Sequence, residues 1–424
     1  MSEKKGLPAA LAAAGQQTAV LPGGLTVAVR PMPGRSMVSA LFGTRFGSVD
    51  ECFALQGQQV RLPQGTAHYL EHKKFESEQG DAFLRFAETG ADADAYTGYD
   101  RTMYTVSAVE EPEKNLDLLL EMVLHPWFTP ATVAKEQGII RQEIEMYDDN
   151  PEWRMMAALC RCLYHCHGLR ADIAGTVESI PDITPEMLYR CHGAFYRPEH
   201  MVLAAAGPIT LEQVLAACAR AGLDKPFPGD SGQRLPVPEP MTVCARQLTE
   251  RMAVAKPCFG VGFKERPLTG DVLRQETLID LICECIAGGM TPLYRRLYDE
   301  GLVNPGFDSM LVVVRDACCI LFTGESDNPD LAEQLLRQEI LRVQREGVDP
   351  ELFRLSKKMK YGELLDELDN AEDAAGMMAD LAIRGRTVQD QLEVLGSLTP
   401  EEANAALKEL FDPERSASVR LLPA

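Results

Sequence analysis

The sequence predicts an α+β protein of two halves, each a mostly antiparallel sheet with helices packed on one face. Strand-like runs are followed by helical runs, and this order occurs twice along the chain. Five prolines and two glycines separate the two series. A chain of 424 residues with 46% hydrophobic side chains can also bury two sizeable cores. We therefore expect a first half at 1–224, a linker at 225–240 and a second half at 241–424.

The elements of the first half follow from the spacing of apolar residues. Alternating apolar residues favour strands, whereas apolar residues three or four apart favour helices. For example, Ile140, Ile144 and Tyr147 are spaced as one buried helical stripe after Pro130. The expected strands are 25–30, 38–46, 91–97, 102–108 and 201–206, and the expected helices are 81–89, 112–125, 130–148 and 153–164, with a further helix around residues 68–72.

The second half repeats the order of strand and helix. Its expected elements are a strand at 253–263, a helix at 273–286, the start of another helix at 291–299, a hairpin of 307–314 with 318–324, long helices from Pro329 onward and a strand at 416–421. All seven histidines lie between His68 and His200, so the second half cannot repeat a histidine site of the first.

The stretch His68-Tyr69-Leu70-Glu71-His72 predicts a zinc site with a general base. On a helix, residues four apart lie above one another, so both imidazoles point to a common place. Glu71 shares that side and can reach a water molecule there. The order H-x-x-E-H is a known zinc-hydrolase pattern. The alternative is a polar helix face whose pattern arose by chance, so a third ligand is needed to support the site.

The predicted helix at 130–148 offers that ligand. Glu136 and Glu143 are two turns apart and project from one side, whereas Glu145 projects from another. One of the pair can bind the metal while the other orients a ligand or the attacking water. The alternative is a solvated helix face, as for most glutamate pairs.

Together these segments resemble the insulinase family of zinc metallopeptidases, which includes pitrilysin and the mitochondrial processing peptidases. The family pattern is H-x-x-E-H followed further along by a helix with E-x6-E. Other segments similar to the family are 65–67, 75–76, 90–97, 174–180 and 196–201. The resemblance implies one Zn²⁺ per chain held by His68, His72 and Glu143, with Glu136 in a supporting catalytic role. It also implies two homologous halves that form a clamshell, of which only the first carries metal.

The resemblance further implies a zinc-dependent endopeptidase that hydrolyses peptides or unfolded segments in an enclosed chamber. Glu71 would activate the water, and Asp94, Ala95 and Tyr96 would bind substrate along an edge strand. Family members commonly have asparagine where this chain has Asp94. The alternative to a substrate-binding role is that Asp94 ends a strand or pairs with Arg101.

A second departure concerns the substrate clamp in the second half. Many members carry an arginine and a tyrosine there, but the matching segment has Tyr298 and Asn304. An alternative function is therefore a subunit that mainly binds or assembles with a homologous partner, as a homodimer or heterodimer. A zinc hydrolase of a non-peptide substrate is a third reading.

Composition excludes several other classes of protein. A net charge of −21 offers no basic patch for nucleic acid. No stretch approaches the ~20 apolar residues of a membrane helix. The apolar run at 7–14 follows two lysines, but Pro8 interrupts it and two glutamines follow, so we do not expect a signal peptide. Twelve irregularly spaced cysteines favour the cytoplasm.

One other cluster has metal-binding residue types: Cys160, Cys162, His165, Cys166 and His167. No second cysteine pair follows at zinc-finger distance, and residues two apart on a helix point in different directions. We expect the cysteines of this cluster to pack in the core.

Overall fold

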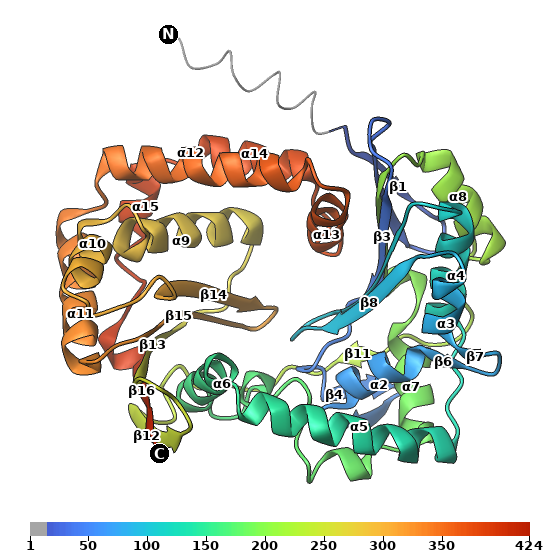
Figure 1. The fold of residues 1–424 in the computed structure, drawn as a ribbon, viewed down its shortest axis with the longest axis horizontal. Coiled ribbons are helices and arrows are strands. Elements are labelled where there is room, and N and C mark those ends of the chain that lie inside the picture. The colour runs from blue at the N-terminus through green and yellow to red at the C-terminus, as the bar shows by residue number, and fades with distance from the viewer. Residues whose placement is uncertain (1–14) are drawn as a thin grey trace. The chain divides into compact units, whose positions relative to one another are not determined.

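The computed structural model describes residues 15–424, so the apolar run at 7–14 lies outside the described residues. The chain forms two compact units, and neither is continuous in sequence (Figure 1). Unit 1 comprises residues up to Glu143 together with Asp172–Leu235 and Glu363–Leu392. Unit 2 comprises Ile144–Ala171, Pro236–Gly362 and Glu393–Ala424. Each unit contains a sheet with packed helices, which confirms the predicted α+β class.

Unit 1 is built on a six-stranded sheet with the order β1-β2-β10-β3-β9-β8. The strands are β1 (Gln17–Val20), β2 (Thr26–Pro31), β10 (Met201–Gly207), β3 (Val38–Thr44), β9 (Thr102–Ala108) and β8 (Asp92–Thr97). Only β2 and β10 are parallel neighbours. Every residue of β3 and β10 is buried, which requires cover on both faces of the sheet. In contrast, β8 is an edge strand.

Helices from both halves of the sequence supply that cover. Figure 1 shows α4 (Pro112–Leu124) and α8 (Leu211–Arg220) on one side of the sheet and α13 (Ala371–Ala382) on the other. The helix α13 packs against β10, β3 and β2 although it lies far along the chain. Beside β8 lies α2 (Thr66–Lys74), the helix with the H-x-x-E-H stretch. The helices α3 (Ala82–Ala87) and α7 (Pro185–Phe195) complete the unit.

Unit 2 is built on a five-stranded sheet with the order β12-β16-β13-β15-β14. The strands are β12 (Gln247–Met252), β16 (Ser416–Pro423), β13 (Cys258–Glu265), β15 (Ala317–Glu325) and β14 (Asp308–Val314). Here α6 (Pro151–Leu163), from the first half of the sequence, packs against β13 and β16. A Cβ atom at Gly260 would lie 2.5 Å from Met155 Sδ, so any larger residue would force side chains of α6 to shift where this helix approaches the strand.

The remaining helices connect or cover these sheets. Three of them, α5 (Pro130–Asp148), α12 (Pro350–Glu367) and α14 (Val388–Ser397), have residues in both units. The others are α9 (Val272–Ala287), α10 (Pro292–Asp299), α11 (Pro329–Glu346) and α15 (Pro400–Ala406), with short 3₁₀ turns at Gly168–Arg170, Ile180–Asp182, Pro198–His200 and Pro413–Arg415. None of the helices within 15–424 combines the length and apolar composition of a bilayer-crossing segment.

Several short strands differ from the sequence expectation. The expected strand at 253–263 is divided, because β12 ends at Met252 and β13 begins at Cys258. A three-stranded sheet of β4 (Cys52–Leu55), β5 (Gln58–Arg61) and β11 (Gln233–Arg234) was not predicted. The strand β11 lies within the proline-rich 225–240 segment, where Arg234 Nε donates to Asp50 Oδ1 at 2.5 Å. Part of this segment is therefore ordered on unit 1. A small hairpin of β6 (Glu76–Ser77) and β7 (Gly80–Asp81) follows α2.

Candidate metal centre

The helix α2 begins at a position that only glycine can occupy. Gly65 has φ 85°, and a Cβ atom there would lie 2.4 Å from Ala174 O. Nearly every residue of α2 is buried, including His68 and Glu71. Burial of both an imidazole and a carboxylate is unfavourable unless they have polar partners, so a solvated polar face does not describe this helix.

The structure brings His68, His72 and Glu143 together. Glu143 Oε1 lies 3.5 Å from His68 Nε2, and Glu143 Oε2 lies 3.2 Å from His72 Nε2. One ligand atom from each residue lies within 4.8 Å of the other two. Within residues 15–424 no other group of three such side chains meets this condition. Glu145 is exposed and lies outside the group.

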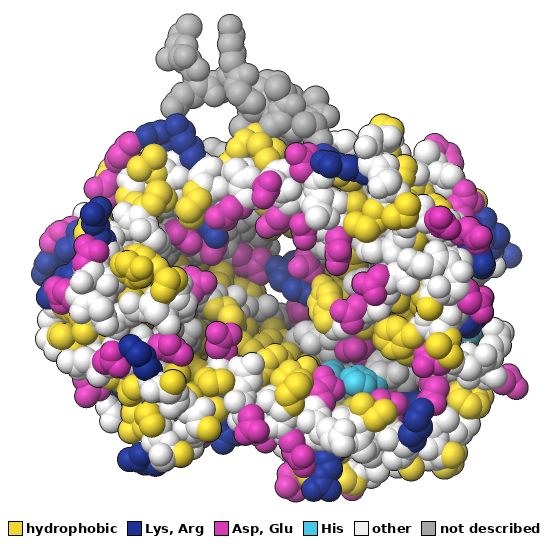
Figure 2. Space-filling view, in the orientation of Figure 1, with side chains coloured by type: hydrophobic (Ala, Val, Ile, Leu, Met, Phe, Trp, Pro, Cys, Tyr) yellow, Lys and Arg dark blue, Asp and Glu magenta, His cyan; other side chains and the backbone are white. Residues whose placement is uncertain are grey.

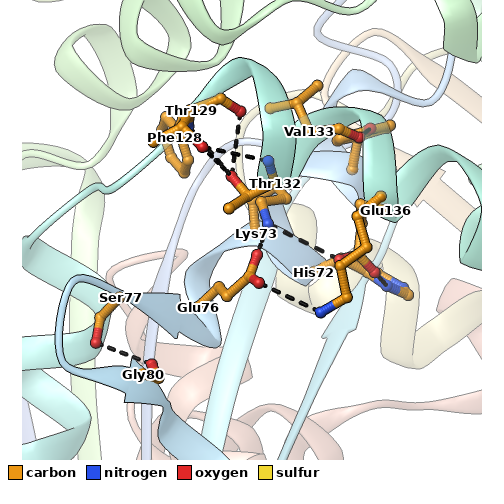
Figure 3. A network of polar contacts seen from close by, with 12 residues as sticks. His72, Lys73, Glu76, Ser77, Gly80, Phe128, Thr129, Thr132, Val133 and Glu136 are labelled. Carbon is orange, nitrogen blue, oxygen red and sulfur yellow. Dashed lines mark hydrogen bonds and ion pairs between the residues drawn. The ribbon is translucent and has the colours of Figure 1, made fainter.

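Glu136 lies on the other side of the His72 imidazole. Its Oε1 is 3.1 Å from His72 Nδ1, and a dashed line marks this contact in Figure 3. Because a carboxylate only accepts, Nδ1 carries the proton and Nε2 is the nitrogen that can bind a metal. Of the two glutamates that the sequence left open, Glu143 faces both imidazoles and Glu136 orients one of them.

The electrostatics of the site favour a positive charge. Burial disfavours the imidazolium of His72, but hydrogen bonds to Glu136 and Glu143 outweigh burial and raise the pKa of His72 to about 10. Burial also raises the pKa of the Glu71 carboxyl, although His68 and a 2.6 Å hydrogen bond from Thr97 Oγ1 to Glu71 Oε2 oppose that rise. A carboxylate with a raised pKa accepts a proton more readily.

The donor set fits zinc. Two imidazole nitrogens and one carboxylate oxygen form a ligand set of catalytic zinc sites, which keep a further position for water. The side chains of His72 and Glu143 are each 21% exposed, and histidine atoms reach the surface among hydrophobic and acidic side chains in Figure 2. His68 Nδ1 is buried, and no group of the described chain bonds to it, so only one of the two imidazoles is fixed by a second partner.

Sequence reasoning missed two polar neighbours of the site. Lys73 is fully buried and bonds to Glu76, and its Nζ lies 3.8 Å from Glu136 Oε2 (Figure 3). Thr97 ends the expected strand 91–97, and its hydroxyl donates to Glu71. A lysine beside a histidine motif is an ordinary surface pattern, so the sequence carries no local signal for either role.

The predicted substrate-binding residues lie on the edge strand β8. Ala95 and Thr97 share one face of the strand, whereas Asp94 and Tyr96 are exposed on the other. Asp94 Oδ1 accepts from Ala95 N at 2.8 Å. The suggested pair of Asp94 with Arg101 is wrong, because the ion pairs of Arg101 join Asp100 and Asp380.

The other sequence candidates lie in unit 2. Tyr298 is exposed, and Asn304 Nδ2 donates to Glu325 Oε2 at 2.7 Å. Cys160 and Cys162 are buried and free, as expected for core residues, but the expectation is wrong for Cys166, which is exposed. His167 Nε2 lies 2.9 Å from Asp316 Oδ1.

Known proteins are similar to this chain in sequence and in fold. Residues 61–177 match "Insulinase (Peptidase family M16)", and residues 182–360 match "Peptidase M16 inactive domain". The "Uncharacterized zinc protease YmfH" of Bacillus subtilis is 34% identical over 94% of this chain and 95% of its own. The "Probable mitochondrial-processing peptidase subunit beta" of Schizosaccharomyces pombe is 28% identical over 47% of this chain and 43% of its own.

A solved structure extends the likeness to the whole fold. The crystal structure of an M16-like peptidase from Alicyclobacillus acidocaldarius has a TM-score of 0.92 and 34% identity, over 96% of this chain and 98% of that one. With its H-x-x-E-H helix and the glutamates of α5, the chain belongs to the insulinase family, peptidase family M16.

Proposed function

We propose that this protein is a zinc-dependent endopeptidase with one Zn²⁺ per chain. The meeting of His68, His72 and Glu143 around one place, with Glu71 buried beside it, carries the proposal. When bound, the ion acidifies water and stabilises negative charge that develops on a carbonyl oxygen. Names of the zinc-protease relatives support the same chemistry.

The residues of the chain divide the remaining work. Glu71 takes a proton from the attacking water and passes it to the leaving nitrogen. Thr97 holds one oxygen of Glu71, so that the other oxygen faces the reaction. Glu136 fixes the ring of His72 through Nδ1.

The substrate is an extended peptide or unfolded segment. The open edge of β8 can pair with an added strand, whose backbone supplies the affinity. Ala95 and Tyr96 lie in the middle of β8, and Asp94 places a carboxylate beside substrate side chains on the exposed face of the strand.

Metal analysis of the purified protein and digestion of a peptide pool test this proposal. We expect one zinc per chain, and its loss in each of His68→Ala, His72→Ala and Glu143→Ala, because two protein ligands hold the ion too weakly. Glu71→Gln keeps zinc but loses hydrolysis by ~10²–10⁴-fold. Glu145 is exposed and lies on α5, the helix that carries Glu143, so Glu145→Gln is the matched control and keeps both zinc and hydrolysis. Zinc retained by Glu143→Ala but lost by Glu145→Gln would contradict the ligand assignment.

A second candidate function is that of a binding or assembly subunit with a homologous partner. The presence of Tyr298 and Asn304, in place of an arginine and a tyrosine, favours it, as does the name of the fission yeast relative. A purified chain that binds zinc but hydrolyses peptides only after addition of a homologous chain would support this function. Hydrolysis by the chain alone supports the endopeptidase.

We place the protein in the cytoplasm. All twelve cysteines are free, as expected for a reducing compartment.

A further inference from the structure

We propose that Lys73 and Glu76 are positioning residues for the metal centre, acting on His72 through Glu136. This inference rests on the proposed zinc site. Figure 3 shows the four side chains as one chain of contacts that leads from the imidazole to the hairpin of β6 and β7. Among the described residues, the ion pairs of the Lys73 and Glu76 side chains do not include His68, His72 or Glu143, so the side-chain route to the metal centre leads through Glu136.

The two oxygens of Glu136 are held by consecutive residues of α2. Oε1 lies 3.1 Å from His72 Nδ1, and Oε2 lies 3.8 Å from Lys73 Nζ. Rotation of the carboxylate would separate it from both partners. The side chain of Glu136 is only 11% exposed, so water offers little replacement for these contacts. Lys73 therefore holds the carboxylate in the orientation that fixes the His72 ring.

Glu76 holds Lys73 in place. The Lys73 side chain is 0% exposed, and a buried ammonium requires nearby carboxylates. Its closest partner is Glu76 Oε2, while Glu76 Oε1 lies 3.4 Å from Lys135 Nζ. Burial alone would raise the pKa of the Glu76 carboxyl, but hydrogen bonds and charge from Lys73 and Lys135 lower it. Glu76 thus remains a carboxylate and keeps the buried ammonium beside Glu136.

The two lysines that bind Glu76 provide a matched pair. Lys73 is buried and also contacts Glu136, whereas Lys135 is 67% exposed and, among the described residues, forms its ion pair with Glu76 alone. If the role of Lys73 were only to pair with Glu76, the two lysines would be equivalent. If Lys73 positions Glu136, only its loss changes the metal centre.

Zinc affinity of the purified full-length protein tests the inference, measured by competition with a chromogenic chelator. We expect Lys73→Met and Glu76→Gln to weaken zinc binding by roughly tenfold, the lower end of the effect of outer partners of metal ligands. Lys135→Met keeps the affinity of the unmodified protein. In a Glu136→Gln background, Lys73→Met has no further effect, because the residue through which it acts is already changed.

Two results would overturn the inference: unchanged affinity in both Lys73→Met and Glu76→Gln, or an equal loss from Lys73→Met with and without Glu136→Gln. The second result would indicate a role in folding only. Glu76 is 23% exposed, so Glu76→Gln decides the question even where Lys73→Met does not fold. Absence of zinc from the unmodified protein would defeat the proposed function itself. If zinc binding is lost in His72→Ala but unchanged in Lys73→Met and Glu76→Gln, only this inference is defeated.

Discussion

The Glu71 carboxylate is held at one oxygen and left open at the other. Thr97 Oγ1 donates to Oε2 at 2.6 Å, and no described group bonds to Oε1. Thr97 Oγ1 also lies 3.5 Å from Thr102 Oγ1, which donates to Phe46 O at 2.8 Å. The end of the edge strand β8 is therefore joined to the general base, so one residue serves both the substrate strand and the proton acceptor.

Replacement of Thr97 tests this role. In Thr97→Val the donor is lost while the shape is kept, and a hydrogen bond to a charged group contributes ~1.5–3 kcal/mol. We expect kcat to fall roughly 10–100-fold with little change in KM or zinc content. Thr97→Ser restores the donor and most of the activity. Thr105→Val, which removes a hydroxyl bonded to the Asp94 carbonyl, is the control and keeps kcat. Equal damage from valine and serine at position 97 would show that packing, and not the hydrogen bond, matters.

Sequence reasoning located the residues of the site that depend on helical spacing. His68, Glu71 and His72 follow from the geometry of one helix. The second helix left Glu136 and Glu143 open as the third ligand, and the family resemblance favoured Glu143. Lys73 and Thr97 could not be found in this way. Their roles depend on which distant segments, β6, β8 and α5, approach α2, and local pattern does not contain that information.

At the level of elements, most of the helices were predictable from the spacing of apolar residues, but the sheets that they cover were not. The amphipathic pattern of α6 indicates one buried face, yet nothing in it indicates that this face packs on β13 and β16 of unit 2. The same holds for α13, which packs on the sheet of unit 1 through a face rich in alanine. Small residues mark both contacts, glycine in β13 and alanine in α13, and these are the signals available in hindsight.

The strand β13 ends at a buried carboxylate whose charge opposes folding. Glu265 accepts from Phe411 N at 2.7 Å and from Arg415 Nη2 at 3.3 Å. Burial outweighs both partners and raises its pKa from the model-compound value of 4.5 to about 7. A carboxyl whose pKa is raised in the folded state makes its full contribution to stability at pH values below the pKa that it has in the unfolded chain. That stabilisation is lost as pH rises through the folded pKa.

Glu265→Gln removes this titration. We expect the free energy of unfolding of the variant, relative to the unmodified protein, to increase by up to about 3 kcal/mol between about pH 4.5 and about pH 8. The measurement is thermal or urea unfolding of both proteins across this range. Because both side chains can accept from Phe411 N, a difference that does not vary with pH would show that Glu265 does not titrate in this window.

At the scale of the whole molecule, the dominant feature is a net charge of −21. Acidic side chains are spread over the face shown in Figure 2, and basic side chains occur singly or in small groups. A field of this kind raises the local concentration of cationic ligands and their association rate, and salt screens it. Composition alone predicts this property, since it depends on the sum of charges and not on the positions of particular residues.

The proposed peptidase should therefore cleave cationic peptides faster at low salt. For two peptides of equal length, one cationic and one neutral, we expect kcat/KM of the cationic peptide to fall by roughly tenfold or more as salt rises from about 0.01 M to about 0.15 M. The neutral peptide should change little. Asp94→Asn separates the global field from a local contact. If the field of the whole chain is responsible, the variant keeps the salt dependence, because one charge of many has been removed. Loss of the salt dependence in Asp94→Asn would instead assign the preference to a single carboxylate on β8, and an equal response of both peptides would remove charge from substrate selection.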